Sequence, residues 1–213
     1  DGVLVCSARL PDEQLIPLLA KQDAVVLLNR HLTSEHAGII RVNDAAGAVT
    51  AVQHLLQTGY ERVGLIAGPS NSTSARERRR GFALANEAGS HPENTPLQVN
   101  CSPNTQSGYQ ATLALLQAHP EINGLFCYND LVAVGALQAC KALGRRVPQD
   151  IALVGCDDIP LAALISPSLT TLAVDKEQLG AEAIQLLIDR IHGDLPAADT
   201  LIEQTLVIRE SAP

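Results

Sequence analysis

Short apolar runs alternate with longer segments of helical periodicity along the chain. Five runs rich in aliphatic and β-branched residues predict buried strands, at residues 3–6, 24–28, 62–67, 124–128 and 151–156. Segments between them repeat apolar residues at helical spacing and predict helices over about 44–58, 74–88, 105–118 and 130–143. This alternation predicts an α/β fold in which parallel sheets are flanked by helices on both faces.

The order of elements changes after Leu172. A helix is predicted from the capping-box-like pair Asp175 and Gln178, and it ends at Gly193. An apolar segment at 201–208 then predicts one final strand. We therefore expect the chain to leave one sheet, cover another and return.

Composition narrows the class of protein. At 213 residues the chain can bury a core without metals or disulfides. Its 46% hydrophobic and 18% charged residues are typical of a soluble globular protein, and no apolar stretch approaches the roughly 20 residues of a membrane span. The net charge of −8 opposes binding to phosphate backbones, so we do not expect this segment to grip nucleic acid by itself.

The cysteines and the chain start add two expectations. The five cysteines are scattered without a C-x-x-C pair, and no histidine has metal-ligand spacing. We expect reduced thiols in a cytoplasmic protein that needs no metal and no cofactor. The chain contains no methionine and opens from Asp1 directly into an apolar run, so we expect it to be a piece of a longer protein.

Polar residues follow the predicted strands at their carboxyl ends, where open α/β sheets bind ligands. We expect Asn129 and Asp157 to face Arg78 there, a set of donors and acceptors that suits a polyhydroxylated or heterocyclic small molecule. The alternative is that such residues only cap the next helix, and this is what we expect of Asp130. Arg78 is expected near a helix start, where its charge opposes the helix dipole and calls for an external acceptor.

Four motifs occur in order along the chain, at residues 65–82, 128–136, 154–159 and 166–172, and a predicted helix at 43–59 precedes them. Together they closely resemble the effector-binding core of the lactose-repressor/galactose-repressor (LacI/GalR) family. The resemblance implies a two-lobed, periplasmic-binding-protein-like (type I) fold with three crossovers. It places 1–42 and 173–200 in the N-terminal lobe, and 43–172 and 201–213 in the C-terminal lobe. A DNA-binding headpiece and the opening units of the first lobe would precede this chain, so the first lobe is expected to be incomplete.

The resemblance also implies an effector site. Family effector contacts match Ser7, Asn29, Ser72, Ser74, Arg78, Asn129 and Asp157. Pro103 and Lys176 stand where relatives often carry an aromatic ring, which weakens stacking on a ligand. A cleft-facing Lys176 would favour an anionic ligand, whereas the alternative is a lysine lying along the surface. We expect a sugar or sugar derivative whose identity the sequence does not give.

The resemblance implies a ligand-responsive transcriptional repressor, with this chain as the sensing and dimerisation core. Its expected partners are a small-molecule effector, operator DNA through the headpiece, and a second copy, with no membrane. We place the two-fold interface on the apolar run after Asp157, read as a loop, at Leu161, Leu164 and Ile165. The alternatives are an exported solute-binding protein of a sugar transporter and an enzyme, although no catalytic or nucleotide-binding motif supports the latter.

Overall fold

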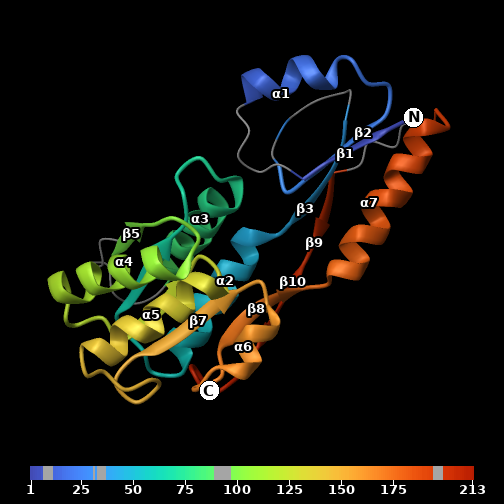
Figure 1. Cartoon of the computed structure of the whole chain (residues 1–213). Helices are drawn as coiled ribbons and strands as arrows, with labels where there is room; N and C mark the ends of the chain where they lie inside the picture. The colour runs from blue at the N-terminus through green and yellow to red at the C-terminus, as the bar shows by residue number, and fades with distance from the viewer. Residues whose placement is uncertain (7–11, 31, 33–36, 89–96, 194–198) are drawn as a thin grey trace. The chain divides into compact units, whose positions relative to one another are not determined.

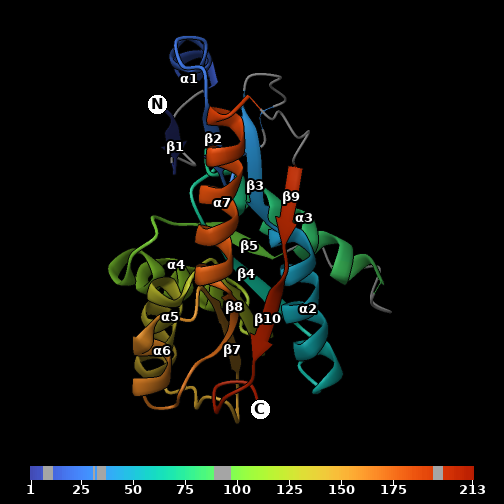
Figure 2. The same cartoon turned by 90° about the vertical axis from the view of Figure 1, so that its right-hand side faces the viewer.

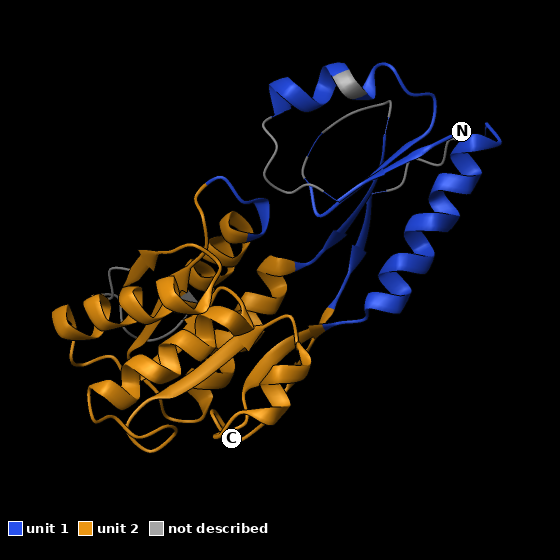
Figure 3. Ribbon diagram, viewed as in Figure 1, with its two compact units in different colours: residues 1–43, 71–74, 174–203 blue, residues 44–70, 75–173, 204–213 orange. Residues whose placement is uncertain are grey.

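The computed structural model describes residues 1–6, 12–30, 32, 37–88, 97–193 and 199–213. Contacts divide the chain into two compact units (Figure 3): residues 1–43, 71–74 and 174–203 form the first, and residues 44–70, 75–173 and 204–213 form the second. Each unit has its own sheet and core, and the chain passes between them several times.

The first unit is a four-stranded sheet with a helix on each face (Figure 1). Its strand order is β1 (Val3–Val5), β2 (Val25–Leu28), β3 (Gly38–Val42) and β9 (Asp199–Ile202), and all three pairings are parallel. Side chains of α1 (Asp12–Leu19) pack on one face and those of α7 (Lys176–Ile191) on the other. Successive side chains of β2 point to opposite faces of the sheet. Val25 and Leu27 therefore lie in the core with α1, whereas Val26 lies in the core with α7.

The second unit is a six-stranded sheet of order β10-β8-β7-β6-β4-β5. The strands are β4 (Val63–Ala67), β5 (Gln98–Asn100), β6 (Gly124–Cys127), β7 (Ala152–Cys156), β8 (Thr170–Val174) and β10 (Gln204–Val207). The pairings from β5 through β4, β6 and β7 to β8 are parallel. Parallel strands aligned in this way bring their carboxyl ends, and the loops that follow them, to one edge.

Helices cover both faces of this second sheet (Figure 2). The helices α2 (Asp44–Gln57) and α3 (Thr73–Ala88) share one core with Phe126 and Val154. The helices α4 (Thr105–Ala118) and α5 (Asp130–Ala142) share the other with Leu125 and Leu153. Adjacent residues of one strand thus enter opposite cores, which confirms the expected α/β fold with helices on both faces.

The predicted helices match the observed ones closely, but helix α1 and strands β3 and β5 were not predicted, and three further segments differ. The expected single strand at 201–208 is two strands, β9 and β10, because the chain changes sheets at Glu203. The apolar run read as a loop is mostly a short helix, α6 (Pro160–Leu164), with proline in its first turn. Strand β8 was not predicted, and its first three residues are fully buried.

No described helix combines the length and the apolar character that crossing a membrane requires.

Candidate functional site

Arg78 is buried in the second turn of α3, with only 7% of its surface exposed. Its Nε donates to Oδ1 of Asp44 at 2.9 Å, and its Nη2 lies 2.8 Å from the same oxygen. Its Nη1 donates to the carbonyl of Tyr128, and the guanidinium lies 5.0 Å from the centroid of that residue's ring. The expectation that Arg78 requires an external acceptor is therefore wrong, because the fold itself supplies a carboxylate and a carbonyl.

Asp157 is the second carboxylate beside Arg78. It follows β7 directly, and its Oδ1 lies 3.8 Å from Nη2 of Arg78. Its φ of 113° is in the left-handed region, and its N–H donates to the carbonyl of Leu172 at 2.8 Å. About 43% of the Asp157 side chain is exposed, so this carboxylate has access to solvent while it faces the buried arginine.

The carboxylates keep Arg78 charged. Burial by itself would lower the pKa of Arg78, but the surrounding acidic groups, including the carboxylates of Asp44 and Asp157, outweigh burial and raise that pKa. The same burial raises the pKa of the Cys156 thiol to about 12, so this thiol stays protonated at neutral pH. The site therefore contains a permanent guanidinium ion held between two carboxylates.

Asp130 does not cap α5, so the expectation for this residue is also wrong. Asn129 is the cap, and its Oδ1 accepts from the N–H of Val132 at 3.0 Å. The buried Asp130 carboxylate instead accepts from Thr171 Oγ1 at 2.6 Å and from the N–H of Ile159 at 2.9 Å. Burial raises the pKa of Asp130 to about 6, although both hydrogen bonds oppose that rise.

Asn129 caps α5 through only one of the two polar groups of its side chain. Its side-chain oxygen caps α5, while it stands next to Tyr128, whose carbonyl and ring contact Arg78. An amide has a separate nitrogen with two donors, and this nitrogen is the group that would serve a ligand.

The other predicted site residues are spread along the chain. Asn29 follows β2 in the first unit with φ of 53°, and its Oδ1 accepts from the N–H of Val42 at 3.0 Å. Ser72 is buried and Ser74 is half-buried within the segment 71–74, which groups with the first unit. Pro103 is half-buried before α4. Ser7 lies outside the described residues.

The expected approach of Asp157 to Arg78 is present in the structure, whereas the sequence did not predict Asp44 as the principal partner of the arginine. Asp44 is the first residue of α2, a position where an aspartate is typical of a helix start, so its local spacing does not point to Arg78. Only packing of α2 against α3 reveals its second role. Gly81 makes this packing close, since a methyl group on its Cα would lie 2.8 Å from Ala48 Cβ and closer still to the carbonyl of Ala45.

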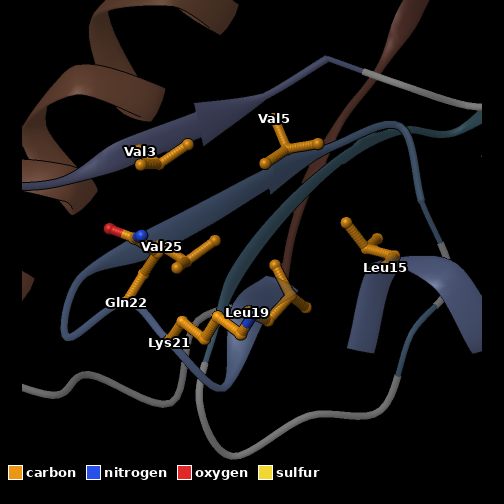
Figure 4. Close-up of a pocket in the computed structure, with 7 residues that line it drawn as sticks. All are labelled: Val3, Val5, Leu15, Leu19, Lys21, Gln22 and Val25. Atoms are coloured by element: carbon orange, nitrogen blue, oxygen red, sulfur yellow. The ribbon is translucent and has the colours of Figure 1, made fainter. Parts of the chain in front are cut away.

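An apolar cavity lies within the first unit, with a volume of about 250 Å³ (Figure 4). Its lining is mainly aliphatic, and it consists of Val3, Val5, Leu15, Leu19, Lys21, Gln22 and Val25. None of the predicted effector contacts that the structure describes is in this lining, and five aliphatic side chains offer nothing to the hydroxyl groups of a sugar. This cavity is therefore not the candidate effector site.

A groove of about 670 Å³ lies on the second unit beside α5 and the segment that follows α6. Its lining is partly apolar and partly basic, and it consists of Val134, Leu137, Gln138, Lys141, Gly144–Val147 and Ile165–Pro167. Beside it, α6 exposes Leu164 to 79% and Leu161 to 38%, while Ala162 is buried in the core.

The described residues contain no cluster of three histidine, cysteine or acidic side chains able to hold a metal ion. All five cysteines are free: three are buried, Cys101 is half-buried and Cys6 is exposed.

Two sheet-based units with polar side chains at the carboxyl ends of parallel strands define a ligand-binding α/β protein. The model of the family described as periplasmic binding protein-like domain matches residues 52–212, and the chain belongs to this family. The ribose operon repressor of Halalkalibacterium halodurans is 35% identical over 218 residues, which cover 99% of this chain and 62% of that repressor. The chain spans about three fifths of the length of the curated relatives it matches.

Solved structures of transcriptional regulators are also similar to this chain. A complex of the transcriptional regulator CelR with cellobiose superposes with a TM-score of 0.92 at 32% identity, covering 99% of this chain and 65% of that one. A LacI family regulator from Enterococcus faecium with bound ribose superposes with a TM-score of 0.89 at 25% identity, covering 100% and 79%. These relatives are named as repressors or regulators of transcription, which favours the regulator over the exported solute-binding protein.

Proposed function

We propose that this chain is the effector-sensing core of a LacI-family repressor and that its effector is a sugar or a sugar derivative. The observation that carries the proposal is the cluster of Arg78, Asp44 and Asp157 at the carboxyl ends of the strands in the second unit. The sugar-bound regulators with the same fold support it, since CelR is seen with cellobiose and its E. faecium relative with ribose.

The chemistry of this cluster suits hydroxyl groups. The carboxylate of Asp157 can accept from two hydroxyls, and Arg78 has five N–H donors, of which Asp44 and Tyr128 use only part. Each such charge-assisted bond is stronger than a bond between neutral groups. Asn129 would add a donor from its amide nitrogen.

Signalling follows from differential affinity. In this proposal Ser7 and Asn29 contact the effector from one lobe, and Arg78, Asn129 and Asp157 contact it from the other. Further contacts come from Ser72, Ser74 and Pro103. An effector that binds one arrangement of the lobes better than another shifts the population toward it. A coupling of about 1–3 kcal/mol per subunit is enough to change operator affinity through a headpiece.

The proposal includes a homodimer in the cytoplasm. The occupant of the exposed α6 surface is a second copy of the chain, through Leu161, Leu164 and Ile165. The groove beside α6 supports this assignment, because an exposed leucine next to a partly apolar groove of about 670 Å³ is a typical dimer surface.

The test is a thermal-shift screen of the full-length protein against sugars, sugar phosphates and nucleosides, followed by operator binding with and without each hit. We expect a neutral sugar to raise the melting temperature by mass action and to change operator affinity. A protein stabilised only by nucleosides, or by none of these ligands, would contradict the sugar-responsive repressor.

A further inference from the structure

Asp44 neutralises the arginine of the candidate site before any ligand arrives. The side chains of Arg78 and Asp44 are only 8% and 5% exposed, and they share two short contacts of 2.9 and 2.8 Å. A buried pair of this kind is nearly neutral as seen by a ligand, because opposite charges this close together cancel at longer range.

Asp157 then makes the local balance negative. One guanidinium faces two carboxylates, Asp44 and Asp157, which leaves a net charge of −1 around Arg78. Neighbouring charges do not reverse this balance. Asp158 is paired with Arg209 at 2.8 Å, and the buried Asp130 adds a further negative charge whenever it is ionised.

The next arginine along α3 makes its hydrogen bonds elsewhere. Arg79 donates from Nη2 to the carbonyl of Gly68 at 3.0 Å and to Asn100 Oδ1 at 2.6 Å, so it is directed to the ends of β4 and β5. A phosphate brought to Arg78 would find a guanidinium already paired with a buried carboxylate and would face Asp157 as a like charge. A hydroxyl group can instead donate to Asp157 and accept from Arg78.

We propose that Asp44 is a specificity-determining residue that selects an uncharged, hydroxylated effector over its phosphorylated form by pairing with Arg78. This inference rests on the proposed sugar-sensing function and deepens it by naming the charge of the ligand. It also assigns Asp44 a role in positioning, because its two contacts set the orientation of the guanidinium plane.

Isothermal titration calorimetry on the full-length protein tests the inference with matched pairs: ribose with ribose 5-phosphate, and cellobiose with its 6-phosphate. In whichever pair binds, we expect the affinity for the neutral sugar to be at least about tenfold higher than the affinity for its phosphate. In Asp44→Asn the side-chain oxygen still accepts from Arg78 but the charge is gone, so this preference should narrow by about tenfold or reverse. Asp150→Asn is the matched control, because it removes an exposed carboxylate paired with Arg146 and should keep the wild-type ratio.

The ratio of the affinity for the neutral sugar to the affinity for its phosphate separates a specificity role of Asp44 from a merely structural one. A weakened fold would lower both affinities together and leave this ratio unchanged. Tighter binding of the phosphate by the wild type, or an unchanged ratio in Asp44→Asn, would overturn the inference while leaving a sugar sensor in place. Binding of neither member of any pair, together with no stabilisation by any sugar or sugar phosphate in the thermal-shift screen, would overturn the sensor itself and the inference with it. If Asp44→Asn does not fold, Asp157→Asn removes the other carboxylate and must also narrow the ratio.

Discussion

Asp130 and Ile159 are joined by a hydrogen bond of 2.9 Å, which ties the first turn of α5 to the loop that carries Asp157. The two residues are 29 positions apart in the chain. Asp157 and Asp158 both have positive φ, a conformation that a residue with a side chain adopts only when its surroundings hold it. A buried carboxylate therefore helps to shape the turn that presents the exposed one.

Asp130 should make stability depend on pH between 5 and 7. Its folded pKa of about 6 lies above the ordinary 3.8, so its contribution to stability is complete below pH 3.8 and is lost as the pH rises through 6. We expect the free energy of unfolding to be about 1 kcal/mol higher at pH 5 than at pH 7 through this group. Urea denaturation of the wild type and of Asp130→Asn at both pH values measures this difference. Equal pH dependence in the two proteins would contradict the assignment.

Arg78 and Asp44 should depend strongly on one another. Arg78→Met leaves a buried carboxylate without its cation, so we expect a loss of about 3 kcal/mol in the free energy of unfolding. The double variant Arg78→Met with Asp44→Leu removes both charges and should regain most of that loss. Chemical denaturation of the single and double variants completes the cycle, and strictly additive losses would show that the pair is not coupled.

Gly81 should be intolerant of even one methyl group. Gly81→Ala drives a Cβ into the backbone of Ala45 at the start of α2, so we expect a loss of about 2 kcal/mol in stability and weaker effector binding. Gly180→Ala is the matched control, because a Cβ there meets nothing within 4 Å in the interior of α7. This control should gain about 0.5–1 kcal/mol from better helix propensity. Thermal unfolding measures the change in stability of each variant. Equal changes in Gly81→Ala and Gly180→Ala would refute the close contact of α2 with α3.

The α6 surface should set the oligomeric state. Leu164 is 79% exposed, so Leu164→Asp changes little within the subunit but places a charge in the proposed two-fold interface. We expect dimer dissociation to become at least about tenfold more favourable, as measured by sedimentation equilibrium. Leu84→Asp on α3, with a wild-type exposure of 47%, serves as the control and should leave the dimer intact. A Leu164→Asp protein that dimerises like the control would remove α6 from the interface.

Local chemistry along the chain was sufficient to predict the five longest helices and the fold class. The helix at 105–118 has both predicted ends, because Asn104 caps it through the N–H of Ser107 and Pro120 follows it. The alternation of short apolar runs with helical segments also predicted helices on both faces of a sheet. Such features depend on neighbours within a few positions, which sequence patterns record directly.

Long-range partners were decided by packing. Arg78 and Asp44 are 34 residues apart, and Asp130 and Thr171 are 41 residues apart, so neither pairing has a signature in local spacing. The same holds for the segment at 199–207, where a continuous apolar pattern divides into β9 and β10 because the two sheets have separate open edges at that point. Periodicity reports whether a side chain is buried, whereas only the tertiary arrangement determines which charge it meets there.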